Sequence, residues 1–342
     1  MNLTCGIVGC GRMGTSHAKS ILLAGHQINY LVDTNTASFD SLLSSVSATE
    51  LKPSTYSSLD QLLKDAVPDL LVIATTADSH ANHAITALSC GVKLILLEKP
   101  AATSLQACSE MAECISRFGG RIAVNHQMRF LPQYSIPKDL LSSPSYGGFK
   151  SMHVTAGNFG MAMNATHYFE AFRFLADESP TKVSAWFDVD VLPNPRGPQF
   201  QDVSGCIRVT TPSGHRLYID ASCDQGHGLQ VTYMGRNGRV TVDELTGDMT
   251  TVVRQSEHSD LPTSRYGMPV DVNHQQIRPV ELVDSSCQVL QALIDGENYP
   301  TLSEATLAVK ILVAAYHSHR NDGASVSLAS VSDSDAEMFS WA

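Results

Sequence analysis

The sequence predicts an α/β chain with a doubly wound parallel sheet, followed by an α+β domain built on an open, mainly antiparallel sheet. Short apolar strands alternate with helices up to residue 124, which is typical of parallel strands with helices on both faces. From about residue 148 the runs are longer and alternate apolar with polar residues, which indicates antiparallel pairing. The length of 342 residues also favours two domains, which we place at residues 1–124 and 125–342.

The first domain is expected to hold short, mostly apolar strands with helices between them. Each predicted helix stops at a glycine, the residue that most often follows a helix end. The strands are predicted at residues 3–8, 28–32, 69–74, 92–97 and 122–124, and the helices at about 15–24, 79–90 and 104–118.

The second domain is expected to hold a sheet whose strands are joined by turns such as Pro212-Ser213-Gly214 and Asn237-Gly238. Residues 256–273 show little periodicity and are predicted to form a long surface loop. An open sheet leaves one apolar face exposed, which predicts a homo-oligomer. Strands are predicted at 182–191, 205–211, 216–221, 229–234 and 238–242, and helices at about 165–177, 275–295 and 303–319.

Composition excludes several classes of function. The net charge of −11 argues against a nucleic-acid partner, because such binding needs a basic face. The eight cysteines form no C-x-x-C pair, so neither a zinc site nor a redox motif is indicated. The N-terminus does not resemble a signal peptide, and no apolar stretch approaches the roughly 20 residues of a membrane span. We expect a cytoplasmic protein without a membrane partner.

The segment Gly9-Cys10-Gly11-Arg12-Met13-Gly14 fits the pattern G-x-G-x-x-G. Chance matches to this pattern are common, but here it follows a strand and opens a helix, as a dinucleotide site requires. Gly9 permits the tight turn, Gly11 lets a pyrophosphate approach the backbone, and Gly14 lets the helix pack closely on the strand. The helix N-terminus then offers its N–H groups to the phosphates. The whole segment, including Arg12 and Met13, is therefore predicted to bind a dinucleotide in a Rossmann domain.

Asp33 lies 19 residues after Gly14, at the end of the second predicted strand. An acidic residue there holds the ribose hydroxyls of NAD; the alternative is an ordinary turn aspartate. Residues 34–40 contain no Lys or Arg, so a 2′-phosphate would meet an acid and no cation. The sequence therefore favours NAD over NADP.

Glu98-Lys99-Pro100 directly follows the fourth predicted strand. Together with the glycine pattern, this segment resembles the Gfo/Idh/MocA family of sugar and inositol oxidoreductases. The resemblance covers nearly the whole chain. The further segments that agree are Ile73–Thr76 with His80, Asn125–Phe130, Gly160–Leu175 and Thr301–Ala305.

The resemblance implies that Lys99 is the catalytic lysine and that His167 is the general acid/base. It also implies dimers or tetramers that pack through the second domain's sheet. The residues it implies on the cofactor side are Thr75, Thr76, His80, Glu98 and Lys99, and those on the substrate side are Lys99, Asn125, Arg129, Met163, Asn164 and His167.

One position departs from the family pattern. The family carries Asp four residues before this histidine, as D-x-x-x-H, whereas this chain has Met163 there, followed by Asn164. Methionine neither relays a proton nor accepts a hydrogen bond from a sugar hydroxyl, and asparagine is not a base. The substrate is therefore expected to differ from that of the inositol dehydrogenases.

The residue types themselves suit hydride transfer from an alcohol, which needs a base for the hydroxyl proton and a cation for the developing alkoxide. Lys99 follows a strand, where ligands of such folds bind, and His167 titrates near neutrality. The alternatives are a solvated lysine and a structural histidine. For Arg129, an anionic substrate and a structural ion pair are equal alternatives. His80 and His83 could share a helix face, but no third ligand is evident, so no metal is predicted.

We therefore expect an enzyme that transfers a hydride between NAD and a hydroxyl or ketone of a sugar, sugar derivative or cyclitol. One alternative is a glycosidase that uses NAD for transient oxidation, which would release no net NADH. Another is a non-catalytic, dinucleotide-binding regulator. The presence of both Lys99 and His167 argues against a regulator, because a sensor needs neither.

Overall fold

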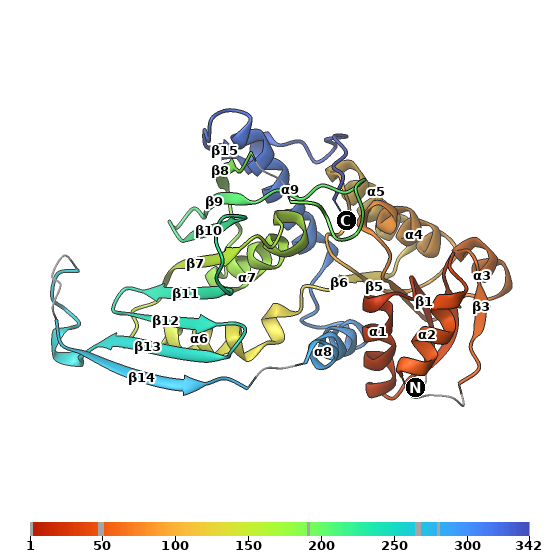
Figure 1. The fold of residues 1–342 in the computed structure, drawn as a ribbon, viewed down its shortest axis with the longest axis horizontal. Helices are drawn as coiled ribbons and strands as arrows, with labels where there is room; N and C mark the ends of the chain where they lie inside the picture. The colour runs from red at the N-terminus through yellow and green to blue at the C-terminus, as the bar shows by residue number, and fades with distance from the viewer. Residues whose placement is uncertain (1–2, 47–50, 190–191, 264–267, 279–280, 342) are drawn as a thin grey trace. The chain divides into compact units, whose positions relative to one another are not determined.

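The computed structural model describes residues 3–46, 51–189, 192–263, 268–278 and 281–341. The chain divides into two compact units, and Figure 1 labels their elements. The first unit contains residues 1–127, 281–309 and 332–342, and the second contains residues 128–280 and 310–331. Each unit is described here by itself.

The first unit holds a six-stranded sheet in the order β3-β2-β1-β4-β5-β6. All neighbouring strands are parallel, and this order is that of a doubly wound dinucleotide-binding sheet. The predicted fold class is therefore confirmed for this part. The strands are β1 (Thr4–Val8), β2 (Gln27–Val32), β3 (Ser54–Tyr56), β4 (Leu70–Ile73), β5 (Leu94–Leu97) and β6 (Arg121–Val124).

The central strands are apolar along their whole length because helices cover both faces of the sheet. All four residues of β4 are buried. A late segment of the chain adds α8, which packs against α1, where the Ser20 hydroxyl donates to the carbonyl of Val283 at 2.9 Å. The helices are α1 (Arg12–Leu23), α2 (Ala37–Ser45), α3 (Leu59–Asp65), α4 (Ala77–Ser89), α5 (Leu105–Phe118), α8 (Leu282–Asp295) and α9 (Leu302–His319), the last of which continues into the second unit.

Three elements of the first unit were not predicted from the sequence. These are β3, α2 and α3, which lie in a stretch rich in Ser and Thr. β3 is three residues long and largely exposed at the sheet edge. The start of α3 does carry a recognisable signal, because the Ser58 hydroxyl accepts the N–H of Gln61 three residues later, as in an S-x-x-Q capping box.

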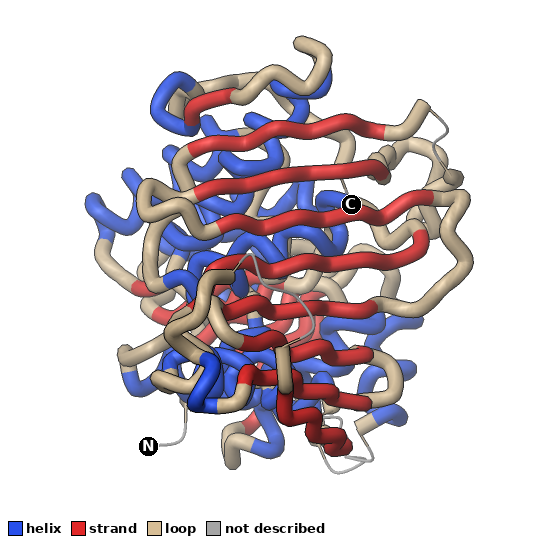
Figure 2. Tube along the Cα trace, turned by 90° about the vertical axis from the view of Figure 1, so that its left-hand side faces the viewer, coloured by secondary structure: helices blue, strands red, loops and turns tan. Residues whose placement is uncertain are grey.

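The second unit holds a nine-stranded sheet in the order β14-β13-β12-β11-β7-β10-β9-β8-β15. Figure 2 shows its strands side by side. Only β7 and β10 pair in parallel, so the mainly antiparallel prediction is confirmed. The strands are β7 (Phe149–Gly157), β8 (Lys182–Phe187), β9 (Gly205–Thr210), β10 (Arg216–Ser222), β11 (Gln230–Gly235), β12 (Gly238–Asp243), β13 (Asp248–Arg254), β14 (Val270–Gln276) and β15 (Val326–Ser327).

Helices α6 (Pro132–Ser142) and α7 (Thr166–Ala176) pack against β7 in the middle of this sheet. The inward residues of β7 include Met152 and Val154, which are buried. The strand was not predicted, because its alternation is interrupted by a histidine and by small residues. A five-residue π-helix, Met161–Ala165, leads into α7.

The long loop predicted at residues 256–273 is wrong in its last part. Residues 256–258 form a 3-10 turn, and β14 begins at Val270 and pairs antiparallel with β13. All seven residues of β14 are exposed, so the strand shows no burial alternation in the sequence. The helix predicted from about residue 275 begins at Leu282. Residues 264–267 lie outside the described chain.

The turn from β1 into α1 depends on glycine at position 14. A Cβ on Gly14 would lie 1.9 Å from the carbonyl oxygen of Gly9, which is backbone and cannot move aside cheaply. Gly14→Ala is therefore expected to lower the free energy of unfolding by about 1–3 kcal/mol or more, as measured by urea denaturation. Gly11→Ala is the matched control, because a Cβ there meets nothing within 4 Å, and its effect should stay within about 1 kcal/mol. Equal losses in the two variants would contradict this account.

Candidate active site

The glycine turn leads directly into α1, and no side chain of the protein caps the first backbone N–H groups of this helix. Gly11 is the N-cap and no side chain caps the helix, so the first N–H groups remain available to a ligand. The first turn, which includes Arg12 and Met13, contains no acidic residue. Because the protein leaves open space for a Cβ at Gly11, any requirement for glycine there must come from a ligand. The segment therefore fits the phosphates of a dinucleotide.

The Asp33 carboxylate lies beside this turn at the end of β2. Its Oδ2 accepts the N–H of Cys10 at 2.7 Å, and its Oδ1 accepts the N–H of Asn35 at 2.8 Å. Asp33 also lines a hollow of about 210 Å³ together with Gly9 and Thr75. A Rossmann domain holds the ribose of its dinucleotide at this place. Asp33 is thus oriented by backbone donors on the rim of a hollow that suits a nucleoside.

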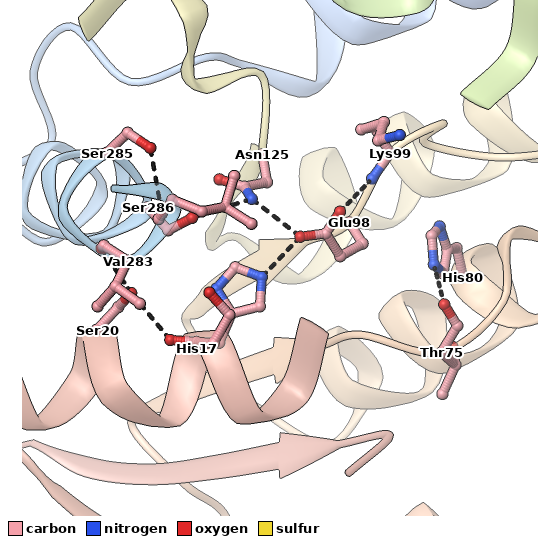
Figure 3. A network of polar contacts seen from close by, with 12 residues as sticks. His17, Ser20, Thr75, His80, Glu98, Lys99, Asn125, Val283, Ser285 and Ser286 are labelled. Atoms are coloured by element: carbon pink, nitrogen blue, oxygen red, sulfur yellow. Dashed lines mark hydrogen bonds and ion pairs between the residues drawn. The ribbon is translucent and has the colours of Figure 1, made fainter. Parts of the chain in front are cut away.

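A buried carboxylate organises the carboxyl end of β5 (Figure 3). Glu98 follows this strand, and its Oε1 accepts a hydrogen bond from His17 Nε2 at 2.7 Å and from Asn125 Nδ2 at 2.9 Å. Its Oε2 accepts the backbone N–H of Lys99 at 3.3 Å. Burial works to raise the pKa of Glu98. The hydrogen bond and charge of His17, the charge of Lys99 and the hydrogen bond from Asn125 outweigh burial and lower this pKa below its usual range. Glu98 is therefore an ionised carboxylate.

His17 was not among the residues singled out from the sequence. It lies on α1, is fully buried, and joins the helix of the glycine turn to the segment that carries Lys99. Its spacing fits the buried face of an amphipathic helix, which gives no sign of a carboxylate partner 81 residues away. Only the structure reveals the pair.

Asn125 is 1% exposed and lies after β6. Its Nδ2 donates to Glu98 and also to the hydroxyl of Ser286 on α8 at 3.3 Å. Both amide hydrogens are thus used inside the first unit. This arrangement suits a residue that holds Glu98 better than one that binds a substrate through its amide nitrogen.

His80 lies on α4 with both ring nitrogens facing backbone carbonyls. Nδ1 is 2.9 Å from the oxygen of Pro100, and Nε2 is 3.1 Å from the oxygen of Thr75. Burial lowers the pKa of His80, against the two carbonyls and Glu98, which raise it. His80 therefore links the segments that follow β4 and β5, through the carbonyls of Thr75 and Pro100. Thr75 accepts the Ser79 hydroxyl at 2.7 Å, and Thr76 is the N-cap of α4.

His167 lies in the second unit, in the first turn of α7. The π-helix before it is held by Asp202, whose carboxylate accepts the N–H of Ala162 at 2.7 Å and of Met163 at 2.8 Å. A Cβ on Gly160 would collide with this carboxylate. Asp202 was missed from the sequence, because it is about 40 residues away in a stretch without periodicity. A carboxylate is thus bound to the backbone of residue 163, whose own side chain is methionine.

The remaining predicted substrate residues have partners within the second unit. Asn164 donates its amide to the carbonyl of Phe159. Arg129 forms an ion pair with Glu170, which is 1% exposed and also receives Arg173 at 3.0 Å. Of the two alternatives for Arg129, the ion pair is the one seen here.

Lys99, Thr75, Thr76, His80, Glu98 and Asn125 belong to the first unit, whereas Arg129, Met163, Asn164 and His167 belong to the second. Among the described residues, no three His, Cys, Asp or Glu side chains are grouped so that they could hold a metal ion. Within that same part of the chain, no helix is long and apolar enough to cross a membrane.

Residues 3–126 match the model of an oxidoreductase family with an NAD-binding Rossmann fold, Gfo/Idh/MocA. The match spans the six strands of the parallel sheet and the Glu98-Lys99-Pro100 segment. The predicted resemblance to this family is therefore confirmed, as is NAD as the cofactor. The open N-terminus of α1 and the orientation of Asp33 fit this cofactor.

The chain is also similar to curated enzymes over most of its length. It is 25% identical to an inositol 2-dehydrogenase of Serratia proteamaculans (strain 568) over 262 residues, which are 71% of this chain and 75% of that enzyme. It is 23% identical to the scyllo-inositol 2-dehydrogenase (NAD(+)) of Bacillus subtilis (strain 168) over 267 residues, 73% of this chain and 76% of that enzyme.

Two solved structures share the fold. A levoglucosan dehydrogenase in complex with NADH has a TM-score of 0.76 at 16% identity, covering 96% of this chain and 99% of that one. GenD2 from gentamicin A biosynthesis, in complex with NAD, has a TM-score of 0.74 at 20% identity, covering 95% and 96%. At these identities the likeness shows the fold alone.

The Glu98 carboxylate should make stability depend on pH. Removing one partner of a buried ion pair costs about 3–5 kcal/mol, and Glu98→Gln is expected to lose about this much at pH 7. The pKa of Glu98 is below its ordinary value of 4.5 in the folded chain. Its contribution is therefore complete above about pH 4.5 and is lost as the pH falls further.

Urea denaturation of the wild type and of Glu98→Gln at pH 7, 5 and 4 checks this expectation. The difference between the two should shrink below about pH 4.5. Glu110→Gln is the control, because Glu110 is exposed on α5, where it accepts a hydrogen bond from the Gln106 side chain. A gap that stays constant down to acid pH would contradict an ionised Glu98.

Proposed function

We propose that this enzyme transfers a hydride between NAD and a hydroxyl, or the matching ketone, of a sugar, sugar derivative or cyclitol. The observation that carries the proposal is the position of Lys99. It follows β5 at the carboxyl end of an NAD-binding sheet, and the buried Glu98 accepts its backbone N–H. The inositol and levoglucosan named for the similar enzymes support the substrate class.

In the proposed mechanism His167 takes the proton of the reacting hydroxyl, and the ammonium group of Lys99 stabilises the negative oxygen that develops. NAD, when bound, supplies the hydride acceptor. Glu98 and His80 act on the backbone on either side of Lys99, through its N–H and through the Pro100 carbonyl. Asp202 acts on the start of the His167 segment.

The two predicted domains divide these tasks. We propose that residues 1–124 bind the dinucleotide and that residues 125–342 bind substrate and form the oligomer. Substrate contacts then come from Lys99, His167 and the Met163-Asn164 segment. The predicted substrate residues Asn125 and Arg129 act indirectly in this proposal, through their bonds to Glu98 and Glu170.

A panel of inositols, sugars and nucleotide sugars, incubated with NAD and followed by NADH absorbance, tests the proposed function. Formation of NADH with one chemical class supports it. Cleavage of a glycoside without net NADH would instead indicate transient oxidation, and NAD binding with no reaction across the panel would favour a regulator.

Lys99→Ala and His167→Ala are each expected to lower kcat/KM about 100- to 10,000-fold. The effects should not multiply in the double variant, because both groups serve one transition state. NAD affinity, measured by calorimetry, should stay nearly unchanged. Lys93→Ala and His274→Ala are matched controls at exposed positions. Near-normal turnover of His167→Ala would remove it from the mechanism, and loss of NAD binding in Lys99→Ala would mark Lys99 as a cofactor ligand.

We also propose a homodimer or homotetramer formed through the sheet of the second unit. Large apolar side chains on its strands are exposed, including Trp186 on β8 and Val272 on β14, each 53% exposed. Multi-angle light scattering is expected to give at least twice the chain mass of 36.9 kDa. A monomer mass at micromolar concentration would contradict the proposal.

A cytoplasmic location completes the proposal. The eight cysteines all lie in the described part of the chain and form no disulfide there, which suits a reducing compartment. Burial raises the pKa of Cys5, Cys10 and Cys108 to about 12, so these three are unreactive.

A further inference from the structure

The segment that follows Lys99 is buried although it is neither helix nor strand. Residues 101–104 are each at most 2% exposed. Because water does not reach such a loop, its backbone N–H and C=O groups need partners within the protein. At the start of the segment, Glu98 accepts the N–H of Lys99 at 3.3 Å. The next carbonyl oxygen, that of Pro100, lies 2.9 Å from His80 Nδ1.

The partners at the far end of this segment come from residues 332–341, which we call the strap. The strap belongs to the first unit, although the residues just before it belong to the second. The N–H of Phe339 donates to the carbonyl of Thr103 at 3.0 Å, and the carbonyl of Asp335 accepts the N–H of Gln106 at 3.0 Å. The strap therefore lies against the place where the Lys99 segment runs into α5 (Figure 1).

The hydrogen bond to Gln106 completes the N-terminus of α5. The first N–H groups of a helix have no partner within the helix itself. Ser104 is the N-cap, and its hydroxyl accepts the N–H of Ala107 at 3.1 Å. The strap supplies the acceptor for Gln106, from a part of the chain far later in the sequence. The start of α5, where the Lys99 segment ends, thus depends on the strap.

Trp341 anchors the strap. It is 1% exposed and is among the largest fully buried side chains of the described residues. Its ring stacks on the ring of Phe339, with centroids 4.5 Å apart and an angle of 11° between the planes. Burial of such a large aromatic side chain favours the docked strap. Because Phe339 is also the donor to Thr103, the stacking of Trp341 fixes the residue that makes this hydrogen bond.

We propose that the strap holds the segment that carries Lys99, and that Phe339 and Trp341 are positioning residues for the Lys99 ammonium group. A displacement of about 1 Å at a reacting group can cost about 100-fold in rate, even when the changed residue is remote. Both aromatic residues act through the backbone of Thr103 and touch no substrate. The inference rests on the proposed function for the role of Lys99, whereas the docking of the strap is measurable without turnover.

Turnover of Trp341→Ala and Trp341→Phe, with the substrate that reacts in the panel, tests the positioning role. Trp341→Ala is expected to lower kcat about 100-fold. NAD affinity should stay nearly unchanged, because the glycine turn and Asp33 make no use of the strap. Trp341→Phe keeps a buried aromatic ring and should recover most of the lost kcat.

Leu88→Ala is the matched control. Leu88 is also fully buried in the first unit, but it lies near the end of α4, toward the amino edge of the sheet. This variant should lose stability and keep its kcat at a temperature where circular dichroism shows every variant folded. An equal loss of kcat in Leu88→Ala and Trp341→Ala would overturn the inference.

The decisive arm is a double-mutant cycle with Lys99→Ala. If Trp341 acts through Lys99, Trp341→Ala lowers kcat less than about threefold once Lys99 is already alanine. Losses that multiply in the double variant would make Trp341 a general structural residue and overturn the inference, as would a near-normal kcat in folded Trp341→Ala. Normal turnover of Lys99→Ala alone would instead overturn the proposed role of Lys99, and the positioning role with it.

Hydrogen exchange followed by mass spectrometry needs no substrate. In Trp341→Ala, peptides that cover residues 101–107 should exchange at least about tenfold faster than in the wild type, because the strap no longer holds their amides in place. Peptides that cover β1 should exchange as in the wild type. Unchanged exchange at residues 101–107 would overturn the inference whichever substrate the enzyme uses.

Discussion

The first unit depends on one buried charge, the carboxylate of Glu98. An ion removed from water costs several kcal/mol unless good partners compensate it. The compensating groups come from α1, from the residue after β6 and from the backbone of Lys99. Ser286 extends the network to α8, a helix contributed from more than 150 residues later in the chain. Charge compensation therefore dictates how these elements meet at the carboxyl end of the sheet.

This arrangement connects the two ends of the cofactor site. His17 lies one and a half turns after the residues that begin α1, and Lys99 lies on the other side of Glu98. The helix that presents N–H groups to phosphate is thus hydrogen-bonded to the segment that carries the candidate catalytic lysine (Figure 3). The position of α1 and the position of the Lys99 backbone therefore both depend on contacts with Glu98.

The sequence was most informative where the constraint is local. The turn at Gly9 and the close approach at Gly14 are backbone requirements, so their spacing alone predicts strand, turn and helix. Apolar strands such as β4 can likewise be predicted from the sequence, because both of their faces are buried and every residue is apolar. The fully exposed β14 and the three-residue β3 carry no such pattern, and they were missed.

The polar contacts were harder to predict because they join distant residues. Asp202 accepts the backbone N–H of Met163 although the two are 39 residues apart in the sequence. Arg129 and Glu170, which form an ion pair, are 41 residues apart. In the sequence alone, each of these polar residues looks like an ordinary surface residue, and its partner is known only once the fold is known.

The central claim is that this chain moves a hydride between a polyol carbon and NAD. The most direct test is isotopic: a reactive sugar or cyclitol, deuterated at its carbinol carbons, is incubated with the enzyme and NAD, and the NADH is analysed by mass spectrometry and NMR. The account predicts one deuterium at C4 of the nicotinamide ring for each ketone formed. Ketone or cleaved product without deuterium in NADH would contradict it.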